Sequence, residues 1–299
     1  MQNDNTLLGN RFTALSNPME PVSTGETPVL QKLNEIRYVI FDFYGTLFIS
    51  GVGDIGIDDG RRDSAILLEA LTACGFRADR NAAERGYQLY EEEVHREQNR
   101  LRKSGIEAPE PVIESVWLNV LNAMKKEGLL SGEISMYTAR LFSVEFEVRM
   151  NPVWPMPGLQ QALHDIHAKG VQLGIISNSQ FYTPIAFESL TGETLDELGF
   201  DPGLLHWSYK ENRKKPSLEF YNRFINRLNG NYPDSKPEQV LFIGNDMLKD
   251  IWPAASLGMK TALFAGDSRS LKWRKDDLRC RDLTPDIVVT ELSQISGCI

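Results

Sequence analysis

A short apolar run that ends in an acid, residues 38–42, constrains the fold more than any other stretch of this chain. The Val-Ile-Phe sequence before the acid is β-branched and aromatic, which is typical of a strand buried on both faces in a parallel sheet. Gly45 then allows a sharp turn. Ligands of open α/β sheets bind outside the carboxyl ends of the strands, so Asp42 is a candidate functional residue. The alternative is that Asp42 only caps a strand-to-loop turn.

The period of the apolar residues becomes helical between residues 60 and 150. Four amphipathic segments follow one another there, separated by glycines and prolines that end or begin helices. They predict a small bundle inserted after the first strand. Residues 49–57 alternate glycines with aliphatic residues and predict a hairpin-like flap over Asp42.

A regular alternation of helices and strands occupies the second half of the chain. The proline-rich residues 151–158 cannot continue a helix and return the chain to the core. With the strand before Asp42, the alternation predicts an α/β fold, a doubly wound (Rossmann-like) parallel sheet core with an inserted four-helix cap domain. The further strands are expected at residues 171–176, 204–208, 240–243, 261–264 and 287–289.

Three parts follow from this pattern. We expect an α/β core made of residues 29–59 and 151–299, and a helical cap made of residues 60–150. Residues 1–28 are rich in Asn, Thr, Pro and Gly and predict a flexible or surface-draped leader without a chemical role.

Polar side chains stand at the ends of four expected strands, and parallel strands bring their carboxyl ends to one edge of a sheet. An Asp nucleophile, a hydroxyl, a lysine and acids for Mg²⁺ are what phosphoryl transfer through an aspartyl-phosphate requires. Oxygen ligands from Asp favour a hard cation such as Mg²⁺. Each group alone also fits a turn, a solvated basic face or a helix cap. The groups are Asp42, Ser177 with Asn178, Lys214 with Lys215, and Asp246 with Asp250.

The four groups resemble, in chain order, the motifs of the haloacid dehalogenase superfamily. The apolar strand followed by Asp-x-x-Gly-Thr-Leu is similar to motif I, and the resemblance extends from residue 36 to about residue 290. It includes the position and the helical character of a C1-type cap. It implies a hydrolase whose site lies between the core and the cap.

The resemblance also implies roles for individual residues. Lys215 is preferred over its neighbour Lys214 as the motif III lysine because the family's lysines commonly precede proline, here Pro216. The expected Mg²⁺ ligands are Asp42, the backbone carbonyl of Tyr44 and the motif IV acids. The implied set is Asp42 as nucleophile, Thr46 ordering the motif I loop, Ser177 with Asn178 binding phosphate, Lys215 for charge, and Asp246 with Asp250 as paired acids.

Position 44 departs from the family's phosphatases, most of which carry a second Asp there. That Asp protonates the leaving group and later activates water, whereas the phenol of Tyr44, with an ordinary pKa near about 10, is a poor replacement. Asp-x-Tyr-Gly-Thr-Leu-Phe is the form seen in 2-haloacid dehalogenases. In those enzymes a halide leaves without a proton and an ester intermediate is hydrolysed.

Motif IV, in contrast, resembles that of the family's phosphatases. The dehalogenases need no metal and generally have a small neutral residue where this chain has Asp246. A carboxylate there would repel an anionic substrate unless a cation neutralised it. The sequence therefore favours a Mg²⁺-dependent phosphatase acting on a small phosphorylated metabolite through an aspartyl-phosphate on Asp42. The alternatives are a 2-haloacid dehalogenase that forms an ester on Asp42 and a non-catalytic binding protein on the same scaffold.

Composition limits the partners. A formal net charge of −9 argues against nucleic acid or an anionic membrane held by general electrostatics, which leaves a small-molecule substrate. The three cysteines have no Cys-x-x-Cys pair and predict neither a disulfide framework nor a zinc site. Together with the lack of a signal-peptide pattern, this favours the cytoplasm. The oligomeric state is left open.

Overall fold

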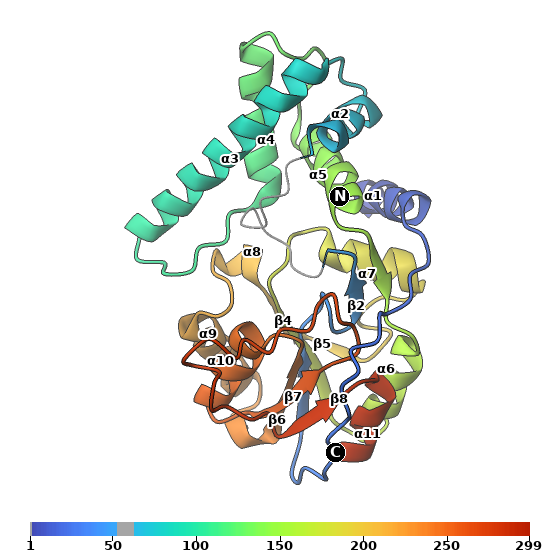
Figure 1. The fold of residues 1–299 in the computed structure, drawn as a ribbon, viewed down its shortest axis with the longest axis vertical. Helices are drawn as coiled ribbons and strands as arrows, with labels where there is room; N and C mark the ends of the chain where they lie inside the picture. Colours follow the sequence, from blue (N-terminus) through green and yellow to red (C-terminus); the bar gives the residue numbers. More distant parts are fainter. Residues whose placement is uncertain (1, 53–62) are drawn as a thin grey trace.

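A six-stranded parallel sheet forms the centre of the α/β part of the molecule in the computed structural model, which describes residues 2–52 and 63–299 (Figure 1). The strand order is β5-β4-β1-β6-β7-β8, and every neighbouring pair is parallel. The first strand is thus central, which fits its fully buried sequence. The strands are β1 (Tyr38–Phe41), β4 (Gln172–Ser177), β5 (Phe200–Trp207), β6 (Val240–Gly244), β7 (Lys260–Phe264) and β8 (Ile287–Val289).

Helices cover both faces of the sheet. Successive residues of β1 point to opposite faces, so Val39 and Phe41 pack in one apolar cluster while Tyr38 and Ile40 pack in another. The first cluster is closed by α6 (Leu159–His167), α7 (Thr183–Thr191) and α11 (Ile295–Cys298), and the second by α9 (Leu218–Asn231) and α10 (Trp252–Ser256). This confirms the expected doubly wound α/β core.

Short elements complete the core. An antiparallel pair of strands, β2 (Phe48–Ser50) and β3 (Val153–Pro155), stands where the chain leaves for the helices and where it returns. The short helices are α8 (Ser208–Glu211), η2 (Pro237–Gln239), η3 (Met247–Ile251) and η4 (Leu292–Gln294).

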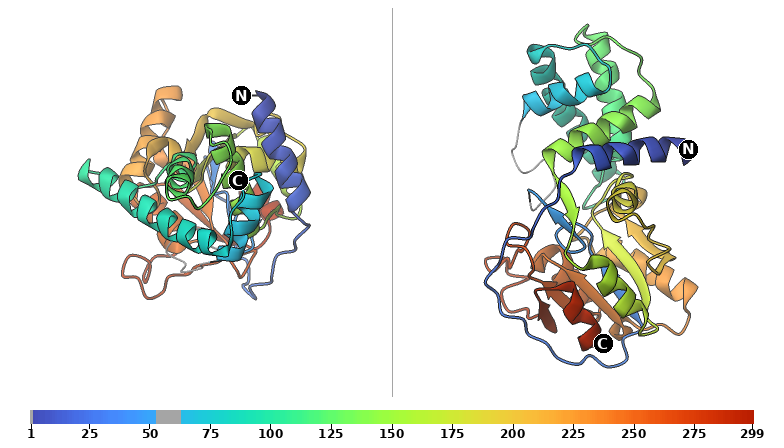
Figure 2. Two further views of the ribbon diagram at one scale, coloured as in Figure 1. Left: turned by 90° about the horizontal axis from the view of Figure 1, so that it is seen from above. Right: turned by 90° about the vertical axis from the view of Figure 1, so that its right-hand side faces the viewer.

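Four helices form a second layer above the strand tips, as expected, and we call them the cap (Figures 1 and 2). They have an apolar cluster of their own, in which the rings of Tyr90 and Trp117 stack with centroids 4.3 Å apart. The cap helices are α2 (Ser64–Ala73), α3 (Arg80–Lys103), α4 (Ile113–Lys126) and α5 (Met136–Met150). Among the described residues, no helix combines the length and apolar composition needed to cross a bilayer.

The flap expected at residues 49–57 lies mostly outside the described residues. Its first residues, Ile49 and Ser50, belong to β2 and pair with Trp154 and Val153 of β3. Residues 53–57 are not described.

The expectation of a flexible leader was wrong for the first half of that segment. Residues Gln2–Leu15 form helix α1, which lies against α5 of the cap and α7 of the core (Figure 2). Leu8 and Phe12, one helical turn apart, are buried at 0% and 1% exposure. Arg11 also pairs with Glu145 of α5. The apolar partners lie about 130–180 residues away in the sequence, and their packing overrides the segment's polar composition.

The second half of the leader is extended and is held along the core. The backbone of Val22 accepts a hydrogen bond from Ser268, and the hydroxyl of Thr24 donates to the carbonyl of Ala265. Val29 forms an antiparallel bridge with Val288 of β8. The leader therefore connects the region of α1 to the segment that follows β7.

Phe12→Ala is expected to destabilise the protein by about 3–5 kcal/mol, because it leaves a cavity between α5 and α7. Chemical denaturation followed by circular dichroism measures the change. The matched control is Leu7→Ala, whose side chain is 45% exposed and whose loss should cost less than about 0.5 kcal/mol. Equal midpoints for the two variants would show that α1 does not contribute through this packing.

Candidate active site

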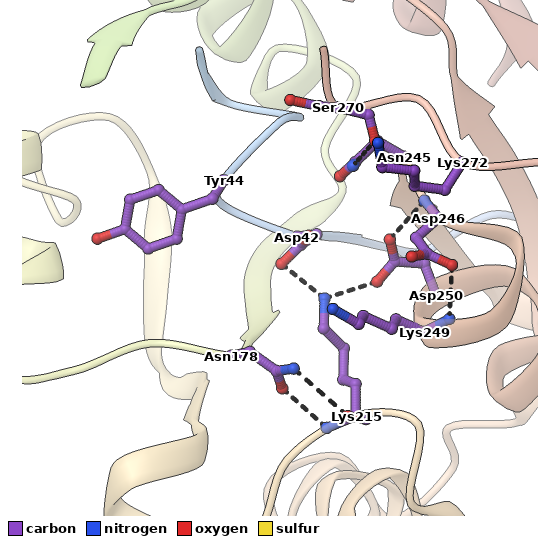
Figure 3. A pocket seen from close by; sticks show the side chains of 10 residues that line it. All are labelled: Asp42, Tyr44, Asn178, Lys215, Asn245, Asp246, Lys249, Asp250, Ser270 and Lys272. Atoms are coloured by element: carbon purple, nitrogen blue, oxygen red, sulfur yellow. Dashed lines mark hydrogen bonds and ion pairs between the residues drawn. The ribbon is translucent and has the colours of Figure 1, made fainter. Parts of the chain in front are cut away.

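A pocket opens at the carboxyl ends of β1, β4 and β6, where the sequence predicted that polar side chains meet (Figure 3). Three carboxylates and three lysines dominate its wall, so it is a strongly charged pocket under the cap. The lining residues are Asp42, Tyr44, Asn178, Lys215, Asn245, Asp246, Lys249, Asp250, Ser270 and Lys272.

The turn after β1 places Asp42 at the pocket. Its backbone N–H donates to the carbonyl of Ile243, 2.8 Å away, which continues the pairing of β1 with β6. Gly45 has φ +82°, and a Cβ there would lie 2.6 Å from Cβ of Ser270. Only glycine fits both the positive φ and the narrow space beside Ser270 without displacing a neighbouring atom. The turn is fixed further by Asn245, which accepts from Thr46 Oγ1 at 3.2 Å and donates to the Ser270 carbonyl at 2.7 Å.

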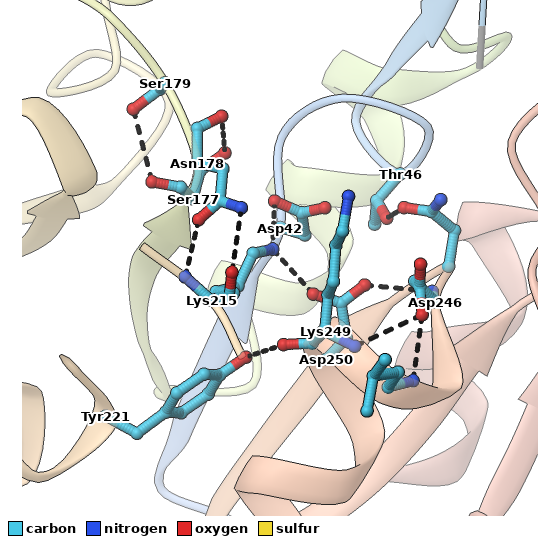
Figure 4. Close-up of polar contacts among 12 residues, drawn as sticks. Asp42, Thr46, Ser177, Asn178, Ser179, Lys215, Tyr221, Asp246, Lys249 and Asp250 are labelled. Carbon is cyan, nitrogen blue, oxygen red and sulfur yellow. Dashed lines mark hydrogen bonds and ion pairs between the residues drawn. The ribbon is translucent and has the colours of Figure 1, made fainter. Parts of the chain in front are cut away.

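Lys215 lies between two carboxylates. Its Nζ is 2.6 Å from Oδ1 of Asp42 and 2.6 Å from Oδ1 of Asp250, and the residue is 3% exposed (Figure 4). Burial lowers the pKa of Lys215, but the Asp250 and Asp42 carboxylates outweigh this effect and its pKa is raised. The lysine is therefore charged and fixes the Asp42 carboxylate.

The backbone of Lys215 is held by Asn178. Asn178 Oδ1 accepts from the Lys215 N–H at 2.8 Å, and Asn178 Nδ2 donates to the Lys215 carbonyl at 3.4 Å. The peptide bond between Lys215 and Pro216 is cis. Of the two neighbouring lysines considered in the sequence, it is Lys215 whose ammonium reaches Asp42, whereas Lys214 does not line the pocket.

Two expected site residues lie behind the pocket wall. Ser177 is fully buried at the end of β4, and its Oγ lies 3.3 Å from the carbonyl of Asn178. Thr46 is also fully buried and holds Asn245. In this structure both support residues that line the pocket.

The two acids after β6 have several partners each. Asp246 Oδ1 accepts from the N–H groups of Leu248 and Lys249, and its Oδ2 lies 2.6 Å from Arg274 Nη2. Asp250 Oδ1 binds Lys215, and its Oδ2 accepts from the Asp246 N–H at 2.9 Å. Burial, opposed by Lys215, raises the pKa of Asp250 to about 7.

The Tyr44 side chain points away from Asp42, toward α7 (Figure 3). Its hydroxyl lies 2.9 Å from Oγ1 of Thr183. Burial, together with the negative charge of Glu147, raises the pKa of Tyr44 well above its ordinary value. In this conformation the phenol therefore stays protonated and faces Thr183, away from a group at Asp42.

Sequence reasoning missed four lining residues, Asn245, Lys249, Ser270 and Lys272. Asn245 stands at the tip of β6 beside Asp246, and its position at a strand end was a usable signal. Lys249 lies one residue before Asp250, in a turn of helix where a solvated lysine is the ordinary case. Ser270 and Lys272 lie in the irregular segment after β7, and nothing in their local sequence marks them.

The model of the haloacid dehalogenase-like hydrolase family matches residues 36–258. The chain belongs to this family. The match contains Asp42, Lys215 and Asp246, which the sequence motifs identified. It ends before Ser270, which no motif marked.

The family members similar to this chain include both phosphatases and dehalogenases. The glyceraldehyde 3-phosphate phosphatase of Pyrococcus furiosus is 28% identical over 141 residues, which are 47% of this chain and 52% of the relative. The chain thus matches about half the length of that curated relative. A 2-haloacid dehalogenase from Pseudomonas syringae pv. Tomato has a similar fold, with 19% identity, a TM-score of 0.50 and coverage of 88% of this chain and 97% of that chain.

A predicted phosphoglycolate phosphatase from Haemophilus somnus is also similar in structure. It shows 16% identity and a TM-score of 0.47, with 88% of this chain and 98% of that chain covered. One fold supports many reactions, so the fold alone does not select an enzyme class. The comparisons support hydrolase activity of the haloacid dehalogenase-like kind.

Tyr44→Phe should change the kcat of this haloacid dehalogenase-like hydrolase by less than about threefold, because the hydroxyl faces Thr183 rather than Asp42. Steady-state hydrolysis by the two proteins tests this expectation. A loss of about 100-fold, the scale of a missing general acid, would instead show that the phenol turns toward the substrate during the reaction.

Proposed function

We propose that the protein is a Mg²⁺-dependent phosphatase that acts on a small phosphorylated metabolite through an aspartyl-phosphate on Asp42. The observation that carries this proposal is the position of Asp246, whose carboxylate lies in the same pocket as Asp42. Three lysines on the pocket wall add positive charge suited to a doubly charged phosphate group. A dehalogenase would place the carboxylate of a haloacid against Asp246, at an electrostatic cost.

The donor set fits a hard cation. Oδ1 of Asp42 is enclosed and, apart from the Lys215 ammonium, has no hydrogen-bond partner among the described residues. Those residues contain no group of three His, Cys, Asp or Glu side chains arranged as a metal site. In this proposal Mg²⁺ would be held by two carboxylates, those of Asp42 and Asp246, and by the backbone carbonyl of Tyr44. Asp250, whose oxygens bind Lys215 and the Asp246 N–H, would support these ligands. A cation there would offset the charge of the phosphate oxygens.

The chain's own residues account for the chemical steps. Lys215 orients the Asp42 carboxylate, so that one Asp42 oxygen forms a bond to phosphorus while the bond to the leaving oxygen breaks. The leaving oxygen takes the electron pair of that bond. Water then attacks the phosphorus and releases inorganic phosphate, which restores the Asp42 carboxylate.

The direction of the Tyr44 side chain sets a limit on the substrate. With no acid from position 44 beside the leaving oxygen, the leaving group must be stable as an anion or must carry its own proton. Acyl phosphates and enol phosphates meet this requirement. Simple alkyl phosphates are expected to react more slowly.

Two other functions remain as alternatives. Tyr44 itself favours a 2-haloacid dehalogenase, in which Asp42 would attack carbon, halide would leave without a proton, and water would hydrolyse the ester. A binding protein on the same scaffold would keep the pocket without turnover.

The decisive test is phosphate release from a panel of acyl, enol and alkyl phosphates, with and without Mg²⁺. We expect Mg²⁺-dependent release that falls by about 1000-fold or more in Asp42→Asn. The exposed Asp276→Asn serves as a control and should retain the wild-type rate. Metal-independent halide release from 2-chloropropionate, lost in Asp42→Asn, would establish the dehalogenase alternative, and no turnover of either kind would favour the binding protein.

Arg274 should oppose cation binding at Asp246. Its guanidinium contacts both carboxylate oxygens, with Nε 3.2 Å from each and Nη2 2.6 Å from Oδ2. The backbone of Arg274 has φ +50°, a region that non-glycine residues rarely adopt. Arg274→Gln removes the positive charge that contacts the Asp246 carboxylate. We expect this variant to bind Mg²⁺ about tenfold more tightly.

Titration calorimetry with Mg²⁺ and no substrate measures this affinity directly. Lys275→Gln removes the same charge from the next, exposed residue and should leave the affinity within about twofold. Weaker Mg²⁺ binding in Arg274→Gln would mean that the arginine orients Asp246 for the cation rather than competing with it.

A further inference from the structure

The loop between α3 and α4 leaves the cap and runs down to the core beside α8 (Figure 1). Residues 108–111 of this loop and Ile113, the first residue of α4, contact Gln180, Ser208 and residues 212–214 of the core. We call this set of contacts the clasp. It lies between the two core segments that carry Asn178 and Lys215.

The backbone part of the clasp ends directly before Lys215. The N–H of Lys214 donates to the carbonyl of Ala108 at 2.9 Å, and the N–H of Glu110 donates to the carbonyl of Asn212 at 3.1 Å. Between these two bonds, Pro109 and Arg213 form an antiparallel bridge. The cap loop thus pairs with the backbone of the segment that leads into Lys215.

Gln180 forms the side-chain part of the clasp on the other segment. Its Nε2 donates to Glu110 Oε1 at 2.9 Å and to the carbonyl of Pro111 at 3.0 Å. Its Oε1 accepts from the N–H of Ile113 at 3.0 Å, at the first residue of α4. One amide two residues after Asn178 therefore satisfies three groups of the cap loop.

Ser208 connects the backbone part of the clasp to its side-chain part. Its hydroxyl accepts from the Ser179 N–H at 2.9 Å and lies within donating distance of the Ser179 carbonyl, at 3.1 Å, and of Glu110 Oε2, at 3.3 Å. Asn178, next to Ser179, holds the backbone of Lys215 on both sides. Hydrogen bonds thus link Glu110 of the cap to Ser208 and Ser208 to Ser179. The adjacent residue, Asn178, bonds to the backbone of the lysine at Asp42, and Figure 4 shows this last step.

The clasp places the half-buried carboxylate of Glu110 between the cap loop and the core. Burial raises the pKa of Glu110, and the nearby charge of Lys214 opposes that rise. A polar network of this kind fixes one geometry, because each donor and acceptor loses energy when its partner moves. Lys215 needs such precision, since its Nζ must stay within hydrogen-bond distance of two carboxylates.

We propose that Glu110 and Gln180 are positioning residues, which set the backbone of Lys215 for the hydrolase reaction and couple the placement of the cap to it. The proposal deepens the function proposed above and rests on it for its kinetic consequence. Neither residue lines the pocket, so both act through Asn178 and Lys215. The cap is expected to stay attached to the core at the clasp.

The test compares Gln180→Glu, the exchange of both residues in Q180E/E110Q, and Glu107→Gln. Q180E sets two carboxylates against each other and removes the donor to Pro111. The exchange restores one donor and one acceptor between positions 110 and 180. E107Q removes a charge from an exposed residue of the same loop and is the matched control.

We expect Q180E to lower kcat for phosphate release by about tenfold or more, with KM for the same phosphate changed less than about threefold. The exchange should recover kcat to within about threefold of the wild type, and E107Q should match the wild type. Equal kcat in Q180E and E107Q, or a loss that the exchange does not repair, would overturn the proposal. A wild type that releases no phosphate would contradict the proposed function instead.

Amide hydrogen exchange tests the positioning role without any turnover. In Q180E the amides of residues 212–215 and 217 should exchange at least about fivefold faster, while those of β6 should be unchanged. Unchanged exchange at residues 212–215 and 217 would overturn the proposal whether or not the protein is a phosphatase. Thermal unfolding of each variant identifies any that are merely destabilised.

Discussion

The site depends on one buried ammonium group placed between two carboxylates. Asp42, Asp246 and Asp250 are each at most 7% exposed, and collecting their charges away from water costs several kcal/mol per ion unless they are compensated. Lys215 binds both Asp42 and Asp250 at 2.6 Å. The parallel sheet is what makes this arrangement possible, because it brings the ends of β1 and β6 to one edge under the segment that follows β5.

The same charge balance bears on the choice between enzyme classes. Lys215 neutralises part of the charge of Asp42 and Asp250, and Arg274 neutralises Asp246 from outside. A pocket built only for a haloacid would have no use for a carboxylate that needs its own arginine. A cation that replaces Arg274 at Asp246 would give that carboxylate a role and would leave the lysines to bind a phosphate group.

Sequence reasoning succeeded where the signal was local and failed where it depended on distant contacts. Buried strands and the polar residues at their ends can be recognised within a few residues, so the sheet and Asp42, Lys215 and Asp246 were predictable. Leu8 and Phe12 are among the few apolar residues of a polar segment, and their partners near α5 and α7 become adjacent only in the fold. Lys272 and the clasp residues share this limit, because Glu110 and Gln180 are 70 residues apart.

Among residues 2–52 and 63–299, the cap contacts the core on two opposite sides. Helix α1 packs between α5 and α7 on one side, and the clasp lies beside α8 on the other (Figures 1 and 2). The family model begins only at residue 36, so α1 is an addition of this chain to the matched region. A cap held on two sides cannot swing open about one hinge without breaking one of the two contacts. The pocket is then suited to a substrate small enough to enter between these contacts, and a small phosphorylated metabolite meets that condition better than a phosphorylated macromolecule.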